Sequence, residues 1–150
     1  MQFLALTAAF LLASLPVVAM AEEPQDALWL LGRSIYYFAM HADGTPIRTT
    51  VQHDVPLPAG ACVSCHRRSG LGVAEGGARA SNISGHSLFQ VSNVPPVRPA
   101  YDNALLARAL ISGIDASGRP LSDLMPRYEL TNDEVLAVSR YLRNLGSAKP

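Results

Sequence analysis

Cys62-Val63-Ser64-Cys65-His66 is the most informative stretch of this chain. It holds the only two cysteines among 150 residues, with two residues between them and a histidine directly after the second. Three familiar kinds of site contain such a C-x-x-C pair: a redox dithiol, half of a zinc site and a small disulfide. A redox dithiol of the thioredoxin type lies in a β-α-β unit, and strand patterns are almost absent from this sequence. A zinc site needs two further ligands at set spacing, and a disulfide across so short a loop adds little stability.

The histidine after the second cysteine indicates a different site, the attachment of a haem. Two thiols on one tight turn can both reach the vinyl groups along one edge of a porphyrin. His66 then lies beneath the iron as proximal ligand, because neutral imidazole donates through one ring nitrogen while the other can hold a hydrogen bond. The motif therefore predicts one haem c with its iron, bonded covalently through Cys62 and Cys65 and ligated by His66.

The first 21 residues differ in character from the rest of the chain. Residues 3–18 are almost all apolar, and Ala19-Met20-Ala21 places small residues where a signal peptidase cuts. We predict a signal peptide over residues 1–21, a mature domain over residues 22–150 and localisation in the periplasm. An uncleaved membrane anchor is the alternative, because the apolar run approaches the length of a marginal span.

The charge balance limits the classes of partner. The chain has 12 basic and 12 acidic residues and a formal net charge of zero. A protein of this kind has no overall field to attract nucleic acid or anionic lipid. We therefore expect no nucleic acid among the partners. After residue 21 no stretch of the sequence is apolar for long enough to cross a bilayer, so we also expect no stable membrane insertion of the mature chain. The expected partners are periplasmic redox proteins, such as a dehydrogenase or an oxidase, and the oligomeric state stays open.

Helical periodicity predicts three helices joined by long loops. The first covers residues 26–39, with Asp26 as its N-cap. The second covers residues 102–112, with Asp102 as its N-cap and Gly113 as its stop. The apolar face of the first helix is predicted to be Leu28, Leu31, Ile35 and Phe38.

The last helix carries the clearest start and stop signals. Thr131 and Glu134 have the spacing of a capping box, and Leu130 and Val135 are placed for a hydrophobic staple. Gly146 is the predicted end of this helix. One apolar stripe runs along it, formed by Val135, Val138, Leu142 and Leu145.

Three stretches between the helices have other patterns. Residues 47–55 alternate between apolar and polar side chains, which predicts a short strand or a hairpin arm. Residues 62–100 are rich in Ser, Gly and Pro, which predicts irregular chain. A loop of that length needs internal support, and a cofactor would provide it. Residues 115–126 are predicted to be loop.

The distal ligand of the iron is less clear from the residues alone. Met125 lies in a loop just before the last helix, whereas Met40 ends an apolar helix, where methionine usually fills the core. His41, His53 and His86 are alternative ligands, although each fits an ordinary surface or loop histidine better. An axial methionine would raise the potential of the iron, and a second histidine would lower it.

Four stretches of the chain resemble the monohaem class I c-type cytochromes. They are Gly32-x-x-x-Tyr36, the haem motif, Asn82-Ile83-Ser84-Gly85, and Met125-Pro126 followed by Leu130-Thr131-Asn132-Asp133-Glu134 and Tyr141-Leu142. The resemblance implies an all-α, cytochrome c-like fold with three to four helices and long loops around one covalently attached haem. It also implies that Met125 is the distal iron ligand and that the loop at residues 82–85 supplies a backbone carbonyl to His66.

Two features depart from this resemblance. Residues 40–61 form a hairpin-like insertion where the haem motif usually follows the first helix closely. Arg67 and Arg68 follow the haem histidine, where family members often have glycine. The two arginines are either solvated loop charge, partners of the haem propionates, or a docking site for an acidic protein.

The sequence thus predicts a periplasmic electron carrier with His/Met ligation and no catalytic residue. One alternative is a haem subunit docked to a periplasmic dehydrogenase, with residues 40–61 as a docking arm. Another is a haem enzyme or gas sensor with an open sixth site. No distal acid/base constellation is visible in the sequence, so the carrier is the leading hypothesis.

We expect protein isolated from the periplasm to have the mass of residues 22–150 plus one haem. Its colour should survive acid–acetone extraction and denaturing electrophoresis, because thioether bonds are covalent. Replacing both Cys62 and Cys65 with Ala should give colourless, unstable protein, because the long loops lose the group that supports them. A mature mass equal to that of the bare polypeptide would contradict the haem assignment.

Overall fold

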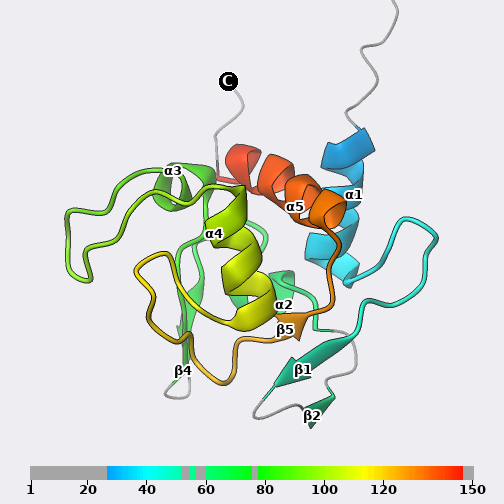
Figure 1. Cartoon of the computed structure of the whole chain (residues 1–150), viewed down its shortest axis with the longest axis horizontal. Coiled ribbons are helices and arrows are strands. Elements are labelled where there is room, and N and C mark those ends of the chain that lie inside the picture. Colours follow the sequence, from blue (N-terminus) through cyan, green and yellow to red (C-terminus); the bar gives the residue numbers. More distant parts are fainter. Residues whose placement is uncertain (1–26, 52–54, 57–59, 76–77, 147–150) are drawn as a thin grey trace, which may run out of the picture.

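A computed structural model describes residues 27–51, 55–56, 60–75 and 78–146 of the chain (Figure 1). The predicted signal peptide, Asp26 and His53 lie outside these residues. No helix in the described ranges is long and apolar enough to cross a membrane. The helices are α1 (Ala27–Phe38), α2 (Val63–His66), α3 (Gly85–Leu88), α4 (Asn103–Ala107), its π-helical continuation η1 (Arg108–Ser112) and α5 (Asn132–Asn144). The strands are β1 (Thr49–Val51), β2 (Val55–Pro56), β3 (Val73–Glu75), β4 (Ala78–Ala80) and β5 (Arg127–Tyr128).

The predicted all-α, cytochrome c-like class is confirmed. Helices and loops make up most of the described chain, and its strands have only two or three residues each. The helix count exceeds the predicted three to four, because the haem segment and the loop after it each wind into a four-residue turn, α2 and α3. The short β3–β4 ladder was also missed, since three residues per strand carry too little alternation to recognise.

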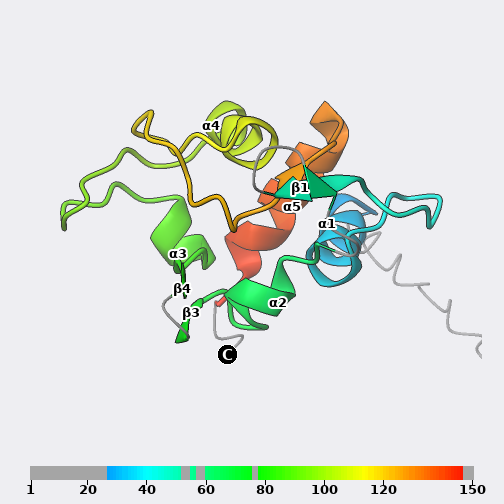
Figure 2. The ribbon, with the colours of Figure 1, turned by 90° about the horizontal axis from the view of Figure 1, so that it is seen from below.

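Helices α1 and α5 cross in direct backbone contact, and both views show them side by side (Figures 1 and 2). A Cβ atom at Gly32 would lie only 2.0 Å from the carbonyl oxygen of Ala137 on α5. Next to the crossing, Tyr36 is fully buried and its ring lies 5.1 Å from that of Tyr141. Glycine is therefore required at residue 32 because no side chain fits between the helices.

The crossing also corrects the predicted face of α1. Ile35 is buried as expected, but Phe38 is 56 % exposed. The buried side of the helix is formed by Gly32, Ile35 and Tyr36. The close approach at Gly32 turns this side toward α5, and Phe38 points elsewhere.

The predicted start of α5 is confirmed in detail. The amide of Glu134 donates to Thr131 Oγ1 at 3.3 Å, and the amide of Thr131 donates to Glu134 Oε2 at 2.8 Å. Nδ1 of His41, from the inserted segment, lies 2.5 Å from Glu134 Oε1. Burial raises the pKa of the Glu134 carboxyl, but hydrogen bonds from Thr131 and His41 outweigh it and bring the pKa below its usual range. The four residues of the predicted stripe are all buried.

The second predicted helix also has the expected ends. The amide of Leu105 donates to Asp102 Oδ1 at 2.7 Å, and Gly113 ends the helix with a left-handed φ of 70°. A Cβ atom at Gly113 would lie 1.9 Å from Nε of Arg127, so the glycine makes room for that guanidinium. Gly113, the predicted end of the helix, therefore also lets this part of the chain pack against Arg127 in β5.

The inserted segment is ordered where it is described. β1 pairs antiparallel with β2, which confirms the predicted hairpin arm. β1 also pairs antiparallel with β5, which directly follows Met125-Pro126, with Thr49 opposite Tyr128 and Thr50 opposite Arg127. The sequence did not predict this second pairing, because β5 has only two residues and its partner is far away along the chain.

We expect Gly32→Ala to destabilise the haem-loaded protein strongly, as measured by thermal unfolding followed by circular dichroism. Alanine gains about 1 kcal/mol over glycine in a helix interior, but a methyl group facing a backbone carbonyl should cost roughly 3 kcal/mol or more. Gly118→Ala is the control, because its added Cβ meets nothing within 4 Å and costs only the strain of a left-handed φ of 83°. An equal loss of thermal stability in the two variants would show that the helix crossing does not require glycine.

Candidate functional site

The haem motif forms a single helical turn. Cys62 precedes α2, and its carbonyl accepts the amide of His66 at 2.9 Å. Cys62 is buried and Cys65 is exposed, so the two sulfurs lie at different depths. After the turn, Arg67 has a left-handed φ of 64°, and its carbonyl accepts the hydroxyl of Tyr36 at 2.5 Å. This backbone conformation favours glycine, which fits the glycine often found after the haem histidine in the family that the sequence resembles.

His66 is held in one orientation by the backbone. Its Nδ1 lies 2.8 Å from the carbonyl oxygen of Ser81, so Nδ1–H donates and Nε2 is left without a proton. Burial lowers the pKa of His66, and the hydrogen bond to Ser81 offsets this only in part. The imidazole is therefore neutral at neutral pH, which is the form that binds metals.

The carbonyl that orients His66 lies one residue before the predicted loop at residues 82–85. The loop at residues 82–85 nonetheless fixes the position of the Ser81 carbonyl. The amide of Ile83 donates to the Gly70 carbonyl at 2.7 Å, and the amide of Gly85 donates to the Leu145 carbonyl at 2.8 Å. The loop is thus attached both to the segment after the haem motif and to the end of α5.

Met125 lies in the loop between η1 and β5. It is partly buried against the core, its amide donates to the Ser122 carbonyl at 2.9 Å, and its carbonyl accepts from the guanidinium of Arg127. Beside it runs a groove of about 800 Å³, lined in part by Arg48 and Thr50. The lining includes neither Cys62 nor His66, so this groove lies along β1 and not along the haem motif.

Tyr128 links the methionine side to the haem motif, and sequence reasoning missed it. Its hydroxyl donates to the Gly60 carbonyl at 2.6 Å and accepts from Cys62 Sγ at 3.6 Å. The side chain is buried, and burial raises the pKa of the phenol far above its usual value. The only signal available in the sequence was its position, three residues after Met125.

The other proposed ligands lie elsewhere. His41 is engaged with Glu134, and His86 is exposed in α3, with Nδ1 3.2 Å from Gln90 Nε2. Met40 is 36 % exposed. Its predicted core position is therefore wrong, because α1 ends at Phe38 and Met40 already belongs to the turn that follows.

A comparison with sequence models of protein families matches "Cytochrome c" over residues 57–146, which is more than half of the chain. The chain belongs to the cytochrome c family. At the level of this family, it is a haem-binding electron-transfer protein whose cofactor is covalently bound haem c with its iron. Comparisons with curated proteins and with solved structures gave no match. The matched range contains the haem motif, Ser81, Met125 and α5.

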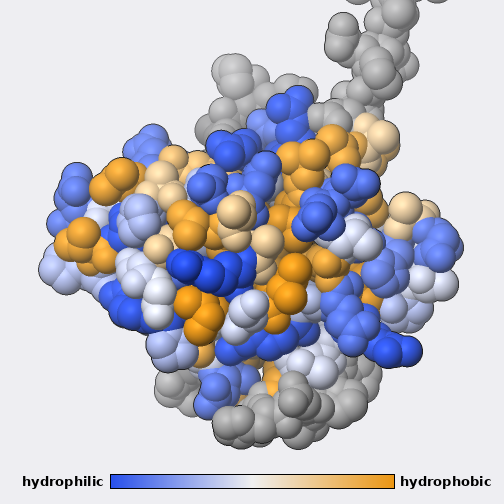
Figure 3. Space-filling model, viewed as in Figure 1, coloured by the Kyte–Doolittle hydropathy of each residue, from blue (hydrophilic) through white to orange (hydrophobic). Residues whose placement is uncertain are grey.

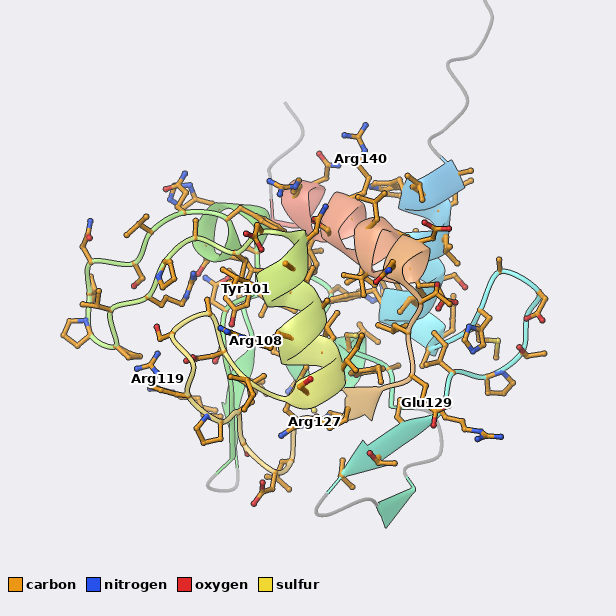
Figure 4. All side chains as sticks on the ribbon, viewed as in Figure 1. Tyr101, Arg108, Arg119, Arg127, Glu129 and Arg140 are labelled. Atoms are coloured by element: carbon orange, nitrogen blue, oxygen red, sulfur yellow. The ribbon has the colours of Figure 1, made fainter. Side chains whose placement is uncertain are left out.

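Arg108 shows that the residues of this cytochrome fit a haem. Its Nη2 donates to the Asp115 carbonyl at 2.6 Å, and in Figure 4 the side chain extends from the helix toward the loop that follows. Its Nε is buried and has no hydrogen-bond partner among the described residues. Haem carries two carboxylates, and a carboxylate is the acceptor that such a guanidinium N–H needs. Arg67 and Arg68, the arginines considered from the sequence, are both exposed.

We expect Arg108→Leu to lower the reduction potential of the haem, because a guanidinium paired with a haem propionate favours the ferrous state. A lost interaction on the order of 1 kcal/mol corresponds to roughly 40 mV for a one-electron couple. Arg119→Leu is the control, since the Arg119 side chain is 46 % exposed and pairs with Asp115 at 2.7 Å. A redox titration in which both variants shift equally would contradict a specific role for Arg108.

Proposed function

We propose that this cytochrome is a single-haem electron carrier, exported to the periplasm, with Cys62 and Cys65 as thioether ligands of the porphyrin. His66 and Met125 are the axial ligands of the iron in this proposal. The observation that carries it is the fixed, neutral imidazole of His66, whose Nδ1 is tied to Ser81 at 2.8 Å and whose Nε2 is available. The position of Met125 in a loop anchored at Pro126 and β5 supports it as the second ligand.

The residues of the chain determine how such a carrier works. When bound, the haem supplies an iron that accepts and releases one electron. His66 keeps the same protonation and orientation throughout, because both are set by a backbone carbonyl. The thioether of Met125 is a soft, neutral ligand, which favours the ferrous state more than a second imidazole would. Ligands held in this way move little when the electron arrives, so electron exchange is fast.

The exposure of the motif supports an exit for the electron on the side of Cys65. Cys65 is exposed and Cys62 is buried, so the thioether at Cys65 is the one closer to solvent. Arg67 and Arg68 follow shortly after Cys65 in the chain and are exposed as well. On the face shown in Figure 3, hydrophobic residues lie in several groups between hydrophilic ones. The formal net charge of the chain is zero, so it has no overall electric field to attract a partner. We therefore propose that a periplasmic redox protein docks through local contacts at the Cys65 side.

We expect Met125→Ala to retain the covalent haem but to change its iron coordination. The reduction potential should fall, the weak red absorption band of iron–methionine coordination should disappear, and carbon monoxide should bind to the ferrous protein. Optical spectra of both oxidation states and a redox titration measure these changes.

Met40→Ala is the matched control for this experiment. Because Met40 is 36 % exposed, its removal should change the free energy of unfolding by no more than about 0.5 kcal/mol and should leave the spectrum unaltered. Native protein that binds carbon monoxide readily, or a Met125→Ala variant with an unchanged spectrum, would show that Met125 is not the ligand.

A further inference from the structure

The segment from residue 40 to residue 61 departs from the class I pattern, in which the haem motif usually follows the first helix closely. It leaves α1, forms β1 and β2, and returns to Cys62. We propose that this segment is a brace that holds the methionine loop in place, with Tyr128 as the positioning residue that joins the two. The inference rests on the proposed role of Met125 as distal ligand and extends it.

The first part of the brace is the pairing of β1 with β5. Thr49 lies opposite Tyr128 and Thr50 opposite Arg127. One step further along, the amide of Glu129 donates to the Arg48 carbonyl at 3.0 Å. Figure 1 shows β5 lying between the helices and β1. The ladder begins two residues after Met125, so the methionine loop cannot swing outward without breaking it.

The second part is a buried contact with the other end of the segment. The hydroxyl of Tyr128 donates to the Gly60 carbonyl at 2.6 Å, and Gly60 lies two residues before Cys62. A Cβ atom at Gly60 would lie 2.8 Å from Oγ1 of Thr49, so Gly60 and β1 are also packed together. β5 is therefore attached to both the outgoing and the returning parts of the segment, next to the haem motif.

The third part lies at the downstream end of the methionine loop. His41 contacts Glu134 at 2.5 Å, and Glu134 completes the capping box that starts α5. The upstream end is held separately, by the amide of Leu121 donating to the Gly113 carbonyl at 2.8 Å. The segment thus restrains β5 and the start of α5, which together form one end of the loop that carries Met125.

The consequence concerns how firmly Met125 is kept on the iron. A ligand in a loop leaves the iron only if the loop moves, and every contact broken by that movement adds to the cost of release. Buried hydrogen bonds such as that of Tyr128 are costly to break, because the separated groups lie in an environment of low dielectric constant. The brace therefore favours the methionine-bound state over states in which an external ligand occupies the iron.

The test is a titration of the ferric holoprotein with imidazole, which competes with the methionine for the iron, followed by loss of the red band. Tyr128→Phe keeps the ring and removes only the hydroxyl. Its loss of one buried hydrogen bond should raise the apparent imidazole affinity about fivefold. Tyr36→Phe is the matched control, since it also removes a hydroxyl that donates to a backbone carbonyl, that of Arg67 on the histidine side. The control should leave the imidazole affinity unchanged.

Gly60→Ala provides a second, independent variant should Tyr128→Phe fail to accumulate. The added methyl group pushes against Thr49 in β1 and should weaken methionine retention in the same direction. If neither variant raises the imidazole affinity, or if Tyr36→Phe raises it equally, the brace is overturned while the ligand assignment stands. A native spectrum that lacks the red band overturns both the ligand assignment and the brace.

Discussion

The backbones of α1 and α5 meet where Gly32 faces the carbonyl of Ala137, and both sides of the haem site are mounted on that contact. Because no side chain separates the helices, α5 cannot shift relative to α1 without a collision. The C-terminal end of α5 holds the histidine side, through the bond from Gly85 to the Leu145 carbonyl. Its N-terminal end holds the methionine side, because the capping box at Thr131 follows β5 closely. A single helix therefore sets the spacing between the loop that orients His66 and the loop that carries Met125.

The two sides of the site differ in the range of the contacts that hold them. His66 and Ser81 are 15 residues apart, whereas Gly60 and Tyr128 are separated by 68 positions. Closing a longer loop costs more conformational entropy, and regions held by few contacts open most easily. The methionine side therefore has the larger entropic cost to offset, and it is the side on which we propose the softer ligand. The inserted segment adds its contacts on that side.

Two polar side chains at the site, His66 and Tyr128, are uncharged near neutral pH. Burial lowers the pKa of His66 and raises the pKa of Tyr128, so neither side chain gains or loses a proton near pH 7. An electron carrier benefits from such surroundings, because the only charge that changes is then the one on the cofactor. Arg108 carries a positive charge, and the buried Nε of its guanidinium, unpaired among the described residues, fits a propionate that would compensate this charge.

The features that depend on residues close together along the chain could be predicted from the sequence alone. The spacing of Cys62, Cys65 and His66, the capping box of α5 and the glycine that ends the second helix are all local patterns. Local hydrogen bonds and backbone conformations produce these features, so a short stretch of residues is enough to predict them. The family match over residues 57–146 includes these stretches.

The contacts between segments far apart in the chain could be seen only in the tertiary structure. In the folded chain Phe38 and Met40 are exposed, the carbonyl that orients His66 is that of Ser81, and β1 pairs with β5. Tyr128 is buried next to the haem motif and the Nε of Arg108 is buried without a hydrogen-bond partner among the described residues, although nothing near either residue in the sequence marks it out. These outcomes depend on the angle of the helix crossing and on contacts between residues far apart in the chain, which local periodicity does not encode.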